Sequence, residues 1–103
     1  MKEETKEFIE NAISKDLIVL FMKGSRDMPM CGFSAKVIEI LNNLNVPYQT
    51  YDILSDEDLR SGIKEFSSWP TIPQLYINKE FVGGCDTCIE MSENGELAKK
   101  LNN

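Results

Sequence analysis

Hydrophobic positions along the chain alternate between a helical period and strand-like runs. In the first fifteen residues apolar side chains recur at one-turn spacing among Lys and Glu, which predicts an amphipathic helix. Residues 17–22 are an uninterrupted apolar run, which predicts a strand buried on both faces. The helical period returns over 32–43, and residues 48–53 supply a further strand. Strand, helix and strand at this spacing predict a parallel pair joined by a right-handed crossover.

The second half of the chain shows the same mixture of patterns. Ser55 followed by Asp58 resembles a capping box at the start of a third helix. The buried stripe expected for that helix consists of Leu59, Ile63 and Phe66. Residues 74–78 and 81–83 predict a hairpin, and 86–101 a last helical stretch with a break at its Asn-Gly pair. This order predicts an α/β protein of thioredoxin-like arrangement, with about four strands in a mixed sheet and helices on both faces.

Composition narrows the chemistry that this chain can perform. It has three cysteines and no histidine in 103 residues. The lack of histidine excludes Ser-His and Cys-His nucleophile pairs, mixed Cys/His zinc sites and imidazole bases, so thiol and carboxylate groups remain. The formal charge of −6 repels phosphate backbones and argues against nucleic-acid binding.

Composition and sequence pattern also indicate the number of domains and the compartment of the protein. No linker, repeat or low-complexity tract divides the chain, so we expect one compact domain over residues 1–103. The longest apolar run, 17–22, is far shorter than the ~20 residues of a membrane-spanning helix. An odd number of cysteines and the lack of a secretory leader favour a reducing compartment. We therefore expect a soluble cytoplasmic protein, with an organelle matrix after leader removal as the alternative.

Cys31 is the first candidate for chemistry because it lies where the loop after the first strand meets a helix. The positive end of a helix favours thiolate over thiol, and Lys23 at the exit of the strand adds a cation. Pro29 and Gly32 on either side argue for exposure rather than for a small buried hydrophobe. Ser34 stands where a dithiol protein has its second cysteine, so no local disulfide can form. One thiolate can still form a mixed disulfide or ligate a metal.

A proline-rich segment precedes the predicted hairpin. Residues 69–73 contain two prolines, which fall within the four positions 70–73, the second directly before the predicted strand. A cis bond between Ile72 and Pro73 would turn the chain sharply and direct the backbone of Ile72 toward the thiol loop. Backbone groups left free there could pair with an extended peptide ligand.

The segment that ends the hairpin and opens the last helix is a further candidate. Gly83 and Gly84 permit close backbone approach, and the N–H groups of a helix start can hold a carboxylate. Asp86 is either a plain N-cap or also the partner of a ligand ammonium group. Cys85 and Cys88 have C-x-x-C spacing, but no second pair accompanies them for a zinc site.

Four motifs in this order and spacing together resemble the monothiol glutaredoxins of the CGFS type. The motifs are Met22-Lys23-Gly24, Cys31-Gly32-Phe33-Ser34, Trp69-Pro70-Thr71-Ile72-Pro73-Gln74 and Gly83-Gly84-Cys85-Asp86. The resemblance runs from about residue 7 to residue 101. It implies a thioredoxin fold and a cis bond before Pro73.

The resemblance also implies a function. It implies that the protein binds a glutathione-ligated [2Fe-2S] cluster between two protomers and transfers it to apoproteins in iron–sulfur protein biogenesis. A further interpretation is that the cluster-bridged dimer signals iron status through a protein partner such as a BolA-like protein. A [2Fe-2S] cluster takes four thiolates, which one Cys31 and one glutathione from each side would supply. The alternative is a glutathione-dependent oxidoreductase that reduces mixed disulfides through Cys31. We expect at most weak enzymatic activity of this kind.

Individual roles follow from the same resemblance. Cys31 matches the cluster ligand and the active thiol. The positions that match glutathione contacts are Lys23, Arg60, Ile72, Cys85 and Asp86. Lys23 and Arg60 would meet the glycyl carboxylate, while Asp86 and the adjacent helix N-terminus would hold the γ-glutamyl end. Lys64, one turn after Arg60, competes for the same contact.

Cys88 departs from the family pattern, which more often has a non-thiol residue at this position. A partial disulfide between Cys85 and Cys88, or between Cys31 and Cys85, would add a redox sensitivity that the motif does not predict. The acidic surface, together with Asp27 and Met28 in the thiol loop, leaves the choice of protein partner open.

Overall fold

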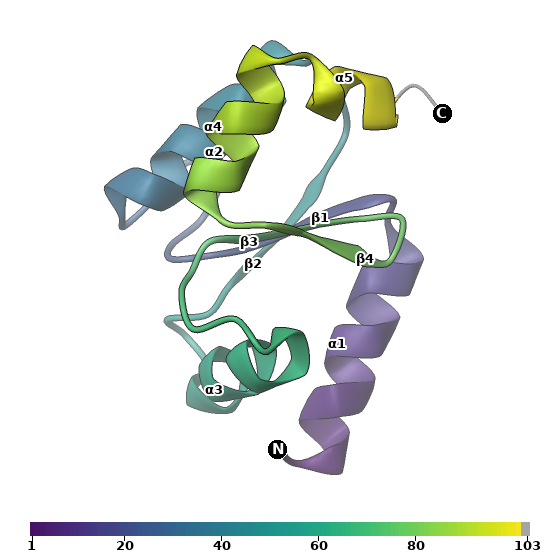
Figure 1. Ribbon diagram of the computed structural model, residues 1–103. Coiled ribbons are helices and arrows are strands. Elements are labelled where there is room, and N and C mark those ends of the chain that lie inside the picture. Colours follow the sequence, from purple (N-terminus) through teal and green to yellow (C-terminus); the bar gives the residue numbers. More distant parts are fainter. Residues whose placement is uncertain (102–103) are drawn as a thin grey trace.

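The computed structural model describes residues 1–101 and places a four-stranded sheet between two layers of helices (Figure 1). The elements in chain order are α1 (Glu3–Lys15), β1 (Ile18–Met22), α2 (Gly32–Asn43), β2 (Gln49–Asp52), α3 (Glu57–Ser67), β3 (Gln74–Ile77), β4 (Glu80–Gly83), α4 (Cys85–Glu93) and α5 (Glu96–Leu101). The strand order is β2-β1-β3-β4, with β1 parallel to β2 and antiparallel to β3. The predicted mixed sheet and its parallel pair are confirmed.

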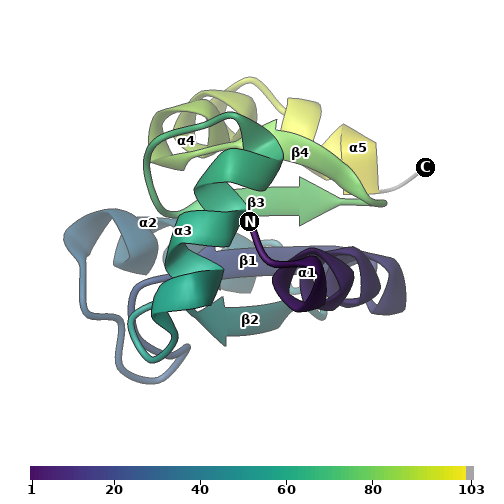
Figure 2. The same cartoon turned by 90° about the horizontal axis from the view of Figure 1, so that it is seen from below.

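The two faces of the sheet carry separate hydrophobic cores. Helices α2, α4 and α5 cover one face, and α1 and α3 cover the other (Figures 1 and 2). All five residues of the central strand β1 are buried, and they alternate between the two cores. Leu17 was expected within this strand, but it precedes β1 and is 57% exposed. Its carbonyl still accepts a hydrogen bond from the Asn78 N–H at 2.8 Å, but the pairing of β1 with β3 begins only at Ile18.

The start of α3 differs from the predicted capping box. Asp56 is the N-cap, and its carboxylate accepts a hydrogen bond from the Leu59 N–H at 3.1 Å. The Ser55 hydroxyl instead donates to the carbonyl of Asp52 at 3.0 Å. Asp and Ser cap helices about equally well, so the neighbouring turn decides which of two adjacent candidates takes the position.

The carboxyl end of β1 is where distant segments of the chain meet. The thiol loop, residues 23–31, leaves β1 at this edge, and β3 begins there because it runs antiparallel. β4 ends at the same edge and leads directly into α4. The peptide bond between Ile72 and Pro73, just before β3, is cis, as predicted. The edge therefore gathers the three motif-bearing loops of the chain.

The C-terminal helical stretch is broken where the Asn-Gly pair predicts. α4 ends at Glu93 and α5 begins at Glu96, with Gly95 between them at φ 82°. Leu97 then anchors α5 in the same core as α4. Among the helices of residues 1–101, none combines the length and the apolarity that crossing a membrane requires.

Candidate functional site

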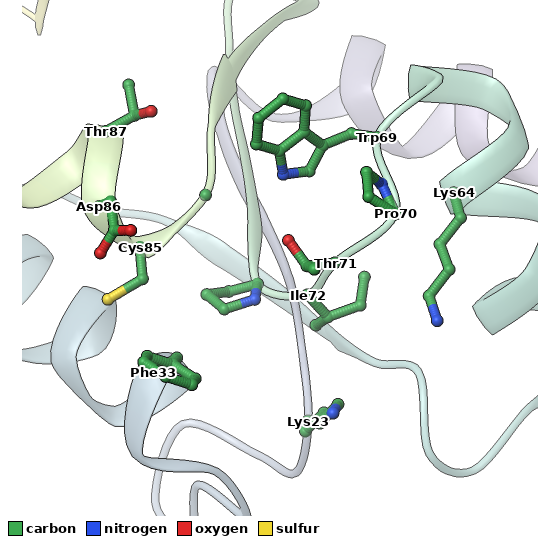
Figure 3. A pocket seen from close by; sticks show the side chains of 12 residues that line it. Lys23, Phe33, Lys64, Trp69, Pro70, Thr71, Ile72, Cys85, Asp86 and Thr87 are labelled. Atoms are coloured by element: carbon green, nitrogen blue, oxygen red, sulfur yellow. The ribbon is translucent and has the colours of Figure 1, made fainter.

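A cavity of about 390 Å³ opens between the three loops at the carboxyl end of β1. Its walls come from the thiol loop, the first turn of α2, the end of α3, the proline segment and the start of α4 (Figure 3). The lining residues are Lys23, Phe33, Lys64, Trp69, Pro70, Thr71, Ile72, Pro73, Gly84, Cys85, Asp86 and Thr87. The cavity brings together residues that lie more than sixty positions apart in the chain.

Cys31 is the N-cap residue of α2 and is half-buried. It is not itself a lining residue, but it lies two positions before Phe33 and close enough to Cys85 to raise the pKa of that thiol, and both of those residues line the cavity. The backbone N–H of Ser34 holds the pKa of Cys31 below its ordinary value, and the Phe33 N–H and the Lys23 charge act in the same direction. Partial burial opposes this shift without reversing it. The predicted helix N-terminus and lysine therefore both favour the thiolate.

Backbone hydrogen bonds give the thiol loop a compact shape. The Met30 N–H donates to the Lys23 carbonyl at 2.8 Å, and Ser25 and Met28 exchange backbone hydrogen bonds at 3.1 Å at the turn of the loop. Gly24 has φ 90°, and a Cβ at this position would lie 2.5 Å from the Met28 carbonyl oxygen. The fully buried Ser34 accepts a hydrogen bond from the Lys23 N–H through its Oγ at 3.1 Å. Ser34 is therefore an anchor of the loop as well as a first-turn helix residue.

A second contact anchors the tip of the loop. The Arg26 guanidinium lies over the Tyr48 ring, 4.0 Å from its centroid, and donates a hydrogen bond to the Tyr48 carbonyl. The Tyr48 hydroxyl in turn donates to the side chain of Asn42 at 2.7 Å. The tip is thus tied to the residue before β2 and to the end of α2. The contact between Arg26 and Tyr48 could not be predicted from the sequence, because no local motif connects these residues.

Gln74 shapes the opposite wall of the cavity. Its side chain is fully buried, and its Nε2 donates to the carbonyls of Trp69 at 3.1 Å and Thr71 at 3.3 Å. Its Oε1 accepts from the Tyr76 hydroxyl at 3.2 Å. The amide therefore supports the proline segment from behind. The one sequence signal for this role is a polar residue at the start of an otherwise apolar strand.

The start of α4 forms the third wall. Gly84 is the N-cap without a side-chain cap, so Asp86 lies in the first turn and its possible role as the N-cap is ruled out. A Cβ on Gly84 would lie 3.3 Å from the Pro73 carbonyl oxygen, which explains the close approach of the two segments. Cys85 is half-buried, and burial, Asp86 and Cys31 all raise its pKa. Of the two thiols at this edge, Cys31 is thus the more readily ionised.

Most of the predicted glutathione contacts do line the cavity. Those that line it are Lys23, Ile72, Cys85 and Asp86. Arg60 is exposed and is not among the lining residues, whereas Lys64, one turn later and nearer the end of α3, is. Cys88 lies in the core, where burial raises its pKa to about 12.

Charge is distributed unevenly around the cavity. Lys23 and Lys64 lie on one side of it, and Asp86 lies across from Lys64 on the other (Figure 3). Within residues 1–101 none of these three side chains takes part in an ion pair. The surfaces between them are apolar or backbone, including Trp69 and Ile72. Such a site is complementary to an extended, zwitterionic peptide.

A thiolate-favouring cysteine at a helix N-terminus and a cis-proline loop, both at the same edge of a mixed sheet, define a thiol protein of thioredoxin-like fold. The glutaredoxin family model matches residues 18–82, and the chain belongs to this family. Ser34 in place of a second cysteine puts it among the monothiol members, in agreement with the relatives that it resembles.

Three similar proteins support this assignment. The chain is 63% identical over 101 residues to an uncharacterized monothiol glutaredoxin of Porphyra purpurea, a match that covers 98% of this chain and 94% of that protein. It is 53% identical over 104 residues to the mitochondrial monothiol glutaredoxin-5 of Lachancea kluyveri, covering 98% and 73%. The solution structure of reduced poplar apo GrxS14 superimposes with a TM-score of 0.84 at 48% identity, covering 94% and 89%.

Proposed function

We propose that this protein binds a [2Fe-2S] cluster together with glutathione between two copies of the chain and transfers it to recipient apoproteins. The observation that carries the proposal is a single thiolate-favouring cysteine beside a cavity with charges complementary to glutathione. The cluster is cargo here, and the protein supplies its binding site and its orientation.

The charged residues of the cavity fit glutathione in one orientation. Glutathione has an ammonium group and a carboxylate at its γ-glutamyl end and a second carboxylate at its glycyl end. Asp86 would take the ammonium, and the free N–H groups of the first turn of α4 would take the adjacent carboxylate. Lys23 and Lys64 would take the glycyl carboxylate, and the backbone of Ile72 would pair with the cysteinyl residue. The cysteinyl thiol then lies on the side of Cys31.

For the glycyl carboxylate we favour Lys64 over Arg60. The two residues are four positions apart on α3, so both project from similar faces of the helix. Lys64 lies nearer the end of the helix, lines the cavity and is half-buried, whereas Arg60 is exposed. Arg60 would act on an anionic ligand only through its longer-range charge.

Counting thiolates supports the shared site. A [2Fe-2S] cluster takes four thiolate ligands. No group of three or more acidic, cysteine or histidine side chains in residues 1–101 is placed to hold a metal ion. Cys88 is buried, and the pKa of Cys85 is raised, so Cys31 is the thiolate that each chain offers. Two chains and two glutathione molecules complete the set.

The surface around Cys31 suits a second copy. Met28, Met30 and Phe33 are each between 63% and 68% exposed, although all three are large and apolar. Exposed apolar groups of this kind around a functional residue favour burial against another protein surface. The homodimer in the cluster-bound state is part of the proposal.

Anaerobic reconstitution tests the proposal. The chain is incubated with ferrous iron, sulfide and glutathione, and its visible spectrum and mass in solution are recorded. We expect a coloured dimer from the wild type and from Cys88→Ala, and a colourless monomer from Cys31→Ser. Alanine is the better replacement for Cys88 because it adds no polar group to the core. Loss of the cluster in Cys88→Ala would mean that the ligand assignment is wrong.

The second candidate function is reduction of glutathione mixed disulfides, favoured by the lowered pKa of Cys31. The Cys31 thiolate would attack the glutathione sulfur of the mixed disulfide, and the substrate leaves as a thiolate that takes up a proton. A second glutathione thiolate then attacks the glutathione bound to Cys31, which restores the Cys31 thiolate and forms glutathione disulfide. A colourless wild-type monomer with rapid turnover of a small mixed disulfide would favour this function over cluster transfer.

Partners and compartment complete the proposal. We propose one domain over residues 1–103, recipient apoproteins as partners and a BolA-like protein as a further one. A related monothiol glutaredoxin of Arabidopsis thaliana is named chloroplastic and that of Lachancea kluyveri mitochondrial. A reducing compartment, either cytoplasm or organelle matrix, suits a chain that depends on free Cys31 and free glutathione.

A further inference from the structure

We propose that Asp52 is a positioning residue of the site: its carboxylate fixes the backbone at Lys23 and Gly24 and thereby holds the Lys23 ammonium at the cavity. The inference rests on the proposed binding of glutathione. Asp52 does not line the cavity, so it would act on the ligand only through Lys23.

Asp52 lies at the end of β2, where it can reach the exit of the neighbouring strand. It pairs with Met22 in the parallel register of β1 and β2. Its Oδ1 accepts hydrogen bonds from the Gly24 N–H at 3.0 Å and the Leu54 N–H at 2.8 Å. One carboxylate oxygen therefore ties together the chain segments that leave β1 and β2.

The backbone of Lys23 and Gly24 forms hydrogen bonds with separate parts of the structure. Its own N–H donates to Ser34 Oγ, and its carbonyl accepts from the Met30 N–H. The next N–H along the chain, that of Gly24, is held by Asp52. Gly24 has positive φ and no room for a side chain, so the backbone there has one well-defined path. Without Asp52 this path loses its only side-chain support from β2 among the described contacts.

Loss of the Asp52 charge and loss of its hydrogen bonds should have opposite effects on glutathione affinity and on the pKa of Cys31. A negative charge near an anionic ligand and a thiolate disfavours both, so loss of the charge alone would strengthen glutathione binding and favour the Cys31 thiolate. Loss of the hydrogen bonds would release Lys23, whose charge lowers the pKa of Cys31. Asp52→Asn removes the charge and keeps an acceptor oxygen, whereas Asp52→Ala removes both. The two variants therefore separate the two effects.

The experiment measures two properties of each variant. The first is the pH dependence of Cys31 alkylation by iodoacetamide in the absence of glutathione, read on the Cys31 peptide by mass spectrometry. The second is the affinity for reduced glutathione, followed by the fluorescence of Trp69, the only tryptophan of the chain, which lines the cavity and is 41% exposed. Asp56→Ala is the matched control, because Asp56 also accepts a backbone N–H but caps α3, and its described hydrogen bond does not involve residues 23–31.

Compared with Asp52→Asn, which has lost the same charge, we expect Asp52→Ala to have its alkylation midpoint at higher pH and to bind glutathione about fivefold more weakly, the loss of one partly exposed ionic contact. Asp52→Asn should keep the wild-type midpoint or lower it, with affinity within about twofold of the wild type. Asp56→Ala should match the wild type in both measurements while being less stable to heat.

The inference is overturned if Asp52→Ala and Asp52→Asn give the same midpoint and affinity, or if Asp56→Ala shifts both as much as Asp52→Ala does. A different result would show that the proposed function is wrong. If the wild type does not bind glutathione, that proposal fails, and the alkylation profiles of the variants still decide the role of Asp52.

Discussion

Replacing Lys64 with alanine should weaken glutathione binding, and replacing Arg60 should not. Lys64 is half-buried at the cavity and faces it together with Lys23, whereas Arg60 is exposed on the preceding turn of α3. A partly exposed ionic contact contributes up to about 1 kcal/mol, which corresponds to about a fivefold loss of affinity. The charge of Arg60 acts through solvent, where salt at 0.15 M screens it over about 8 Å, so its loss should change the affinity by less than about twofold.

The two variants form a matched pair. Each removes one positive charge from the same helix, and within residues 1–101 neither side chain takes part in an ion pair, so both proteins should unfold at similar denaturant concentrations. Titration with glutathione, followed by Trp69 fluorescence at low and physiological salt, measures the difference. A larger loss of affinity in Arg60→Ala than in Lys64→Ala would refute the assignment of the carboxylate contact to Lys64.

Two further predictions concern buried groups. Gln74→Ala should lower the free energy of unfolding by about 2 kcal/mol in urea titrations, because the buried hydroxyl of Tyr76 loses the Gln74 Oε1 acceptor and the carbonyls of Trp69 and Thr71 lose a donor. It should also weaken glutathione binding as the proline segment loosens. Unchanged stability would contradict the role given to Gln74. Burial raises the pKa of Cys88 from 9.0 to about 12, so above pH 9 the unfolded chain loses a proton that the folded chain keeps. Stability should therefore fall between pH 9 and pH 12, less steeply in Cys88→Ala, and equal slopes in the two proteins would contradict this account.

Most of the fold can be predicted because apolar periodicity and burial coincide in this chain. α2 spans Gly32–Asn43, the bounds that the pattern predicts, and β1 is buried on both faces because it is the central strand between two helix layers. The capping of α3 was less predictable. Ser55 and Asp56 are adjacent and both suitable N-caps, and the choice depends on the turn that follows β2.

The site is less predictable than the fold, because motifs identify residues that contact a ligand and not those that support them. Cys31, Lys23 and Asp86 stand in recognisable motifs, and the structure brings all three to one edge. Arg60 and Lys64 are one helical turn apart, so their spacing does not tell which of them reaches the cavity. That depends on how α3 packs on the sheet, and the structure places Lys64 at the cavity. The support from Gln74 consists of bonds to backbone carbonyls, and its one trace in the sequence is a polar residue at the start of an apolar strand, which does not identify its partners.

The composition of the reconstituted complex tests the central claim most directly. Native mass spectrometry under anaerobic conditions would weigh the complex formed with iron, sulfide and glutathione. The account predicts two chains, one [2Fe-2S] cluster and two glutathione molecules, with the complex lost in Cys31→Ser. A cluster held by a single chain, or one retained in Cys31→Ser or without glutathione, would contradict it.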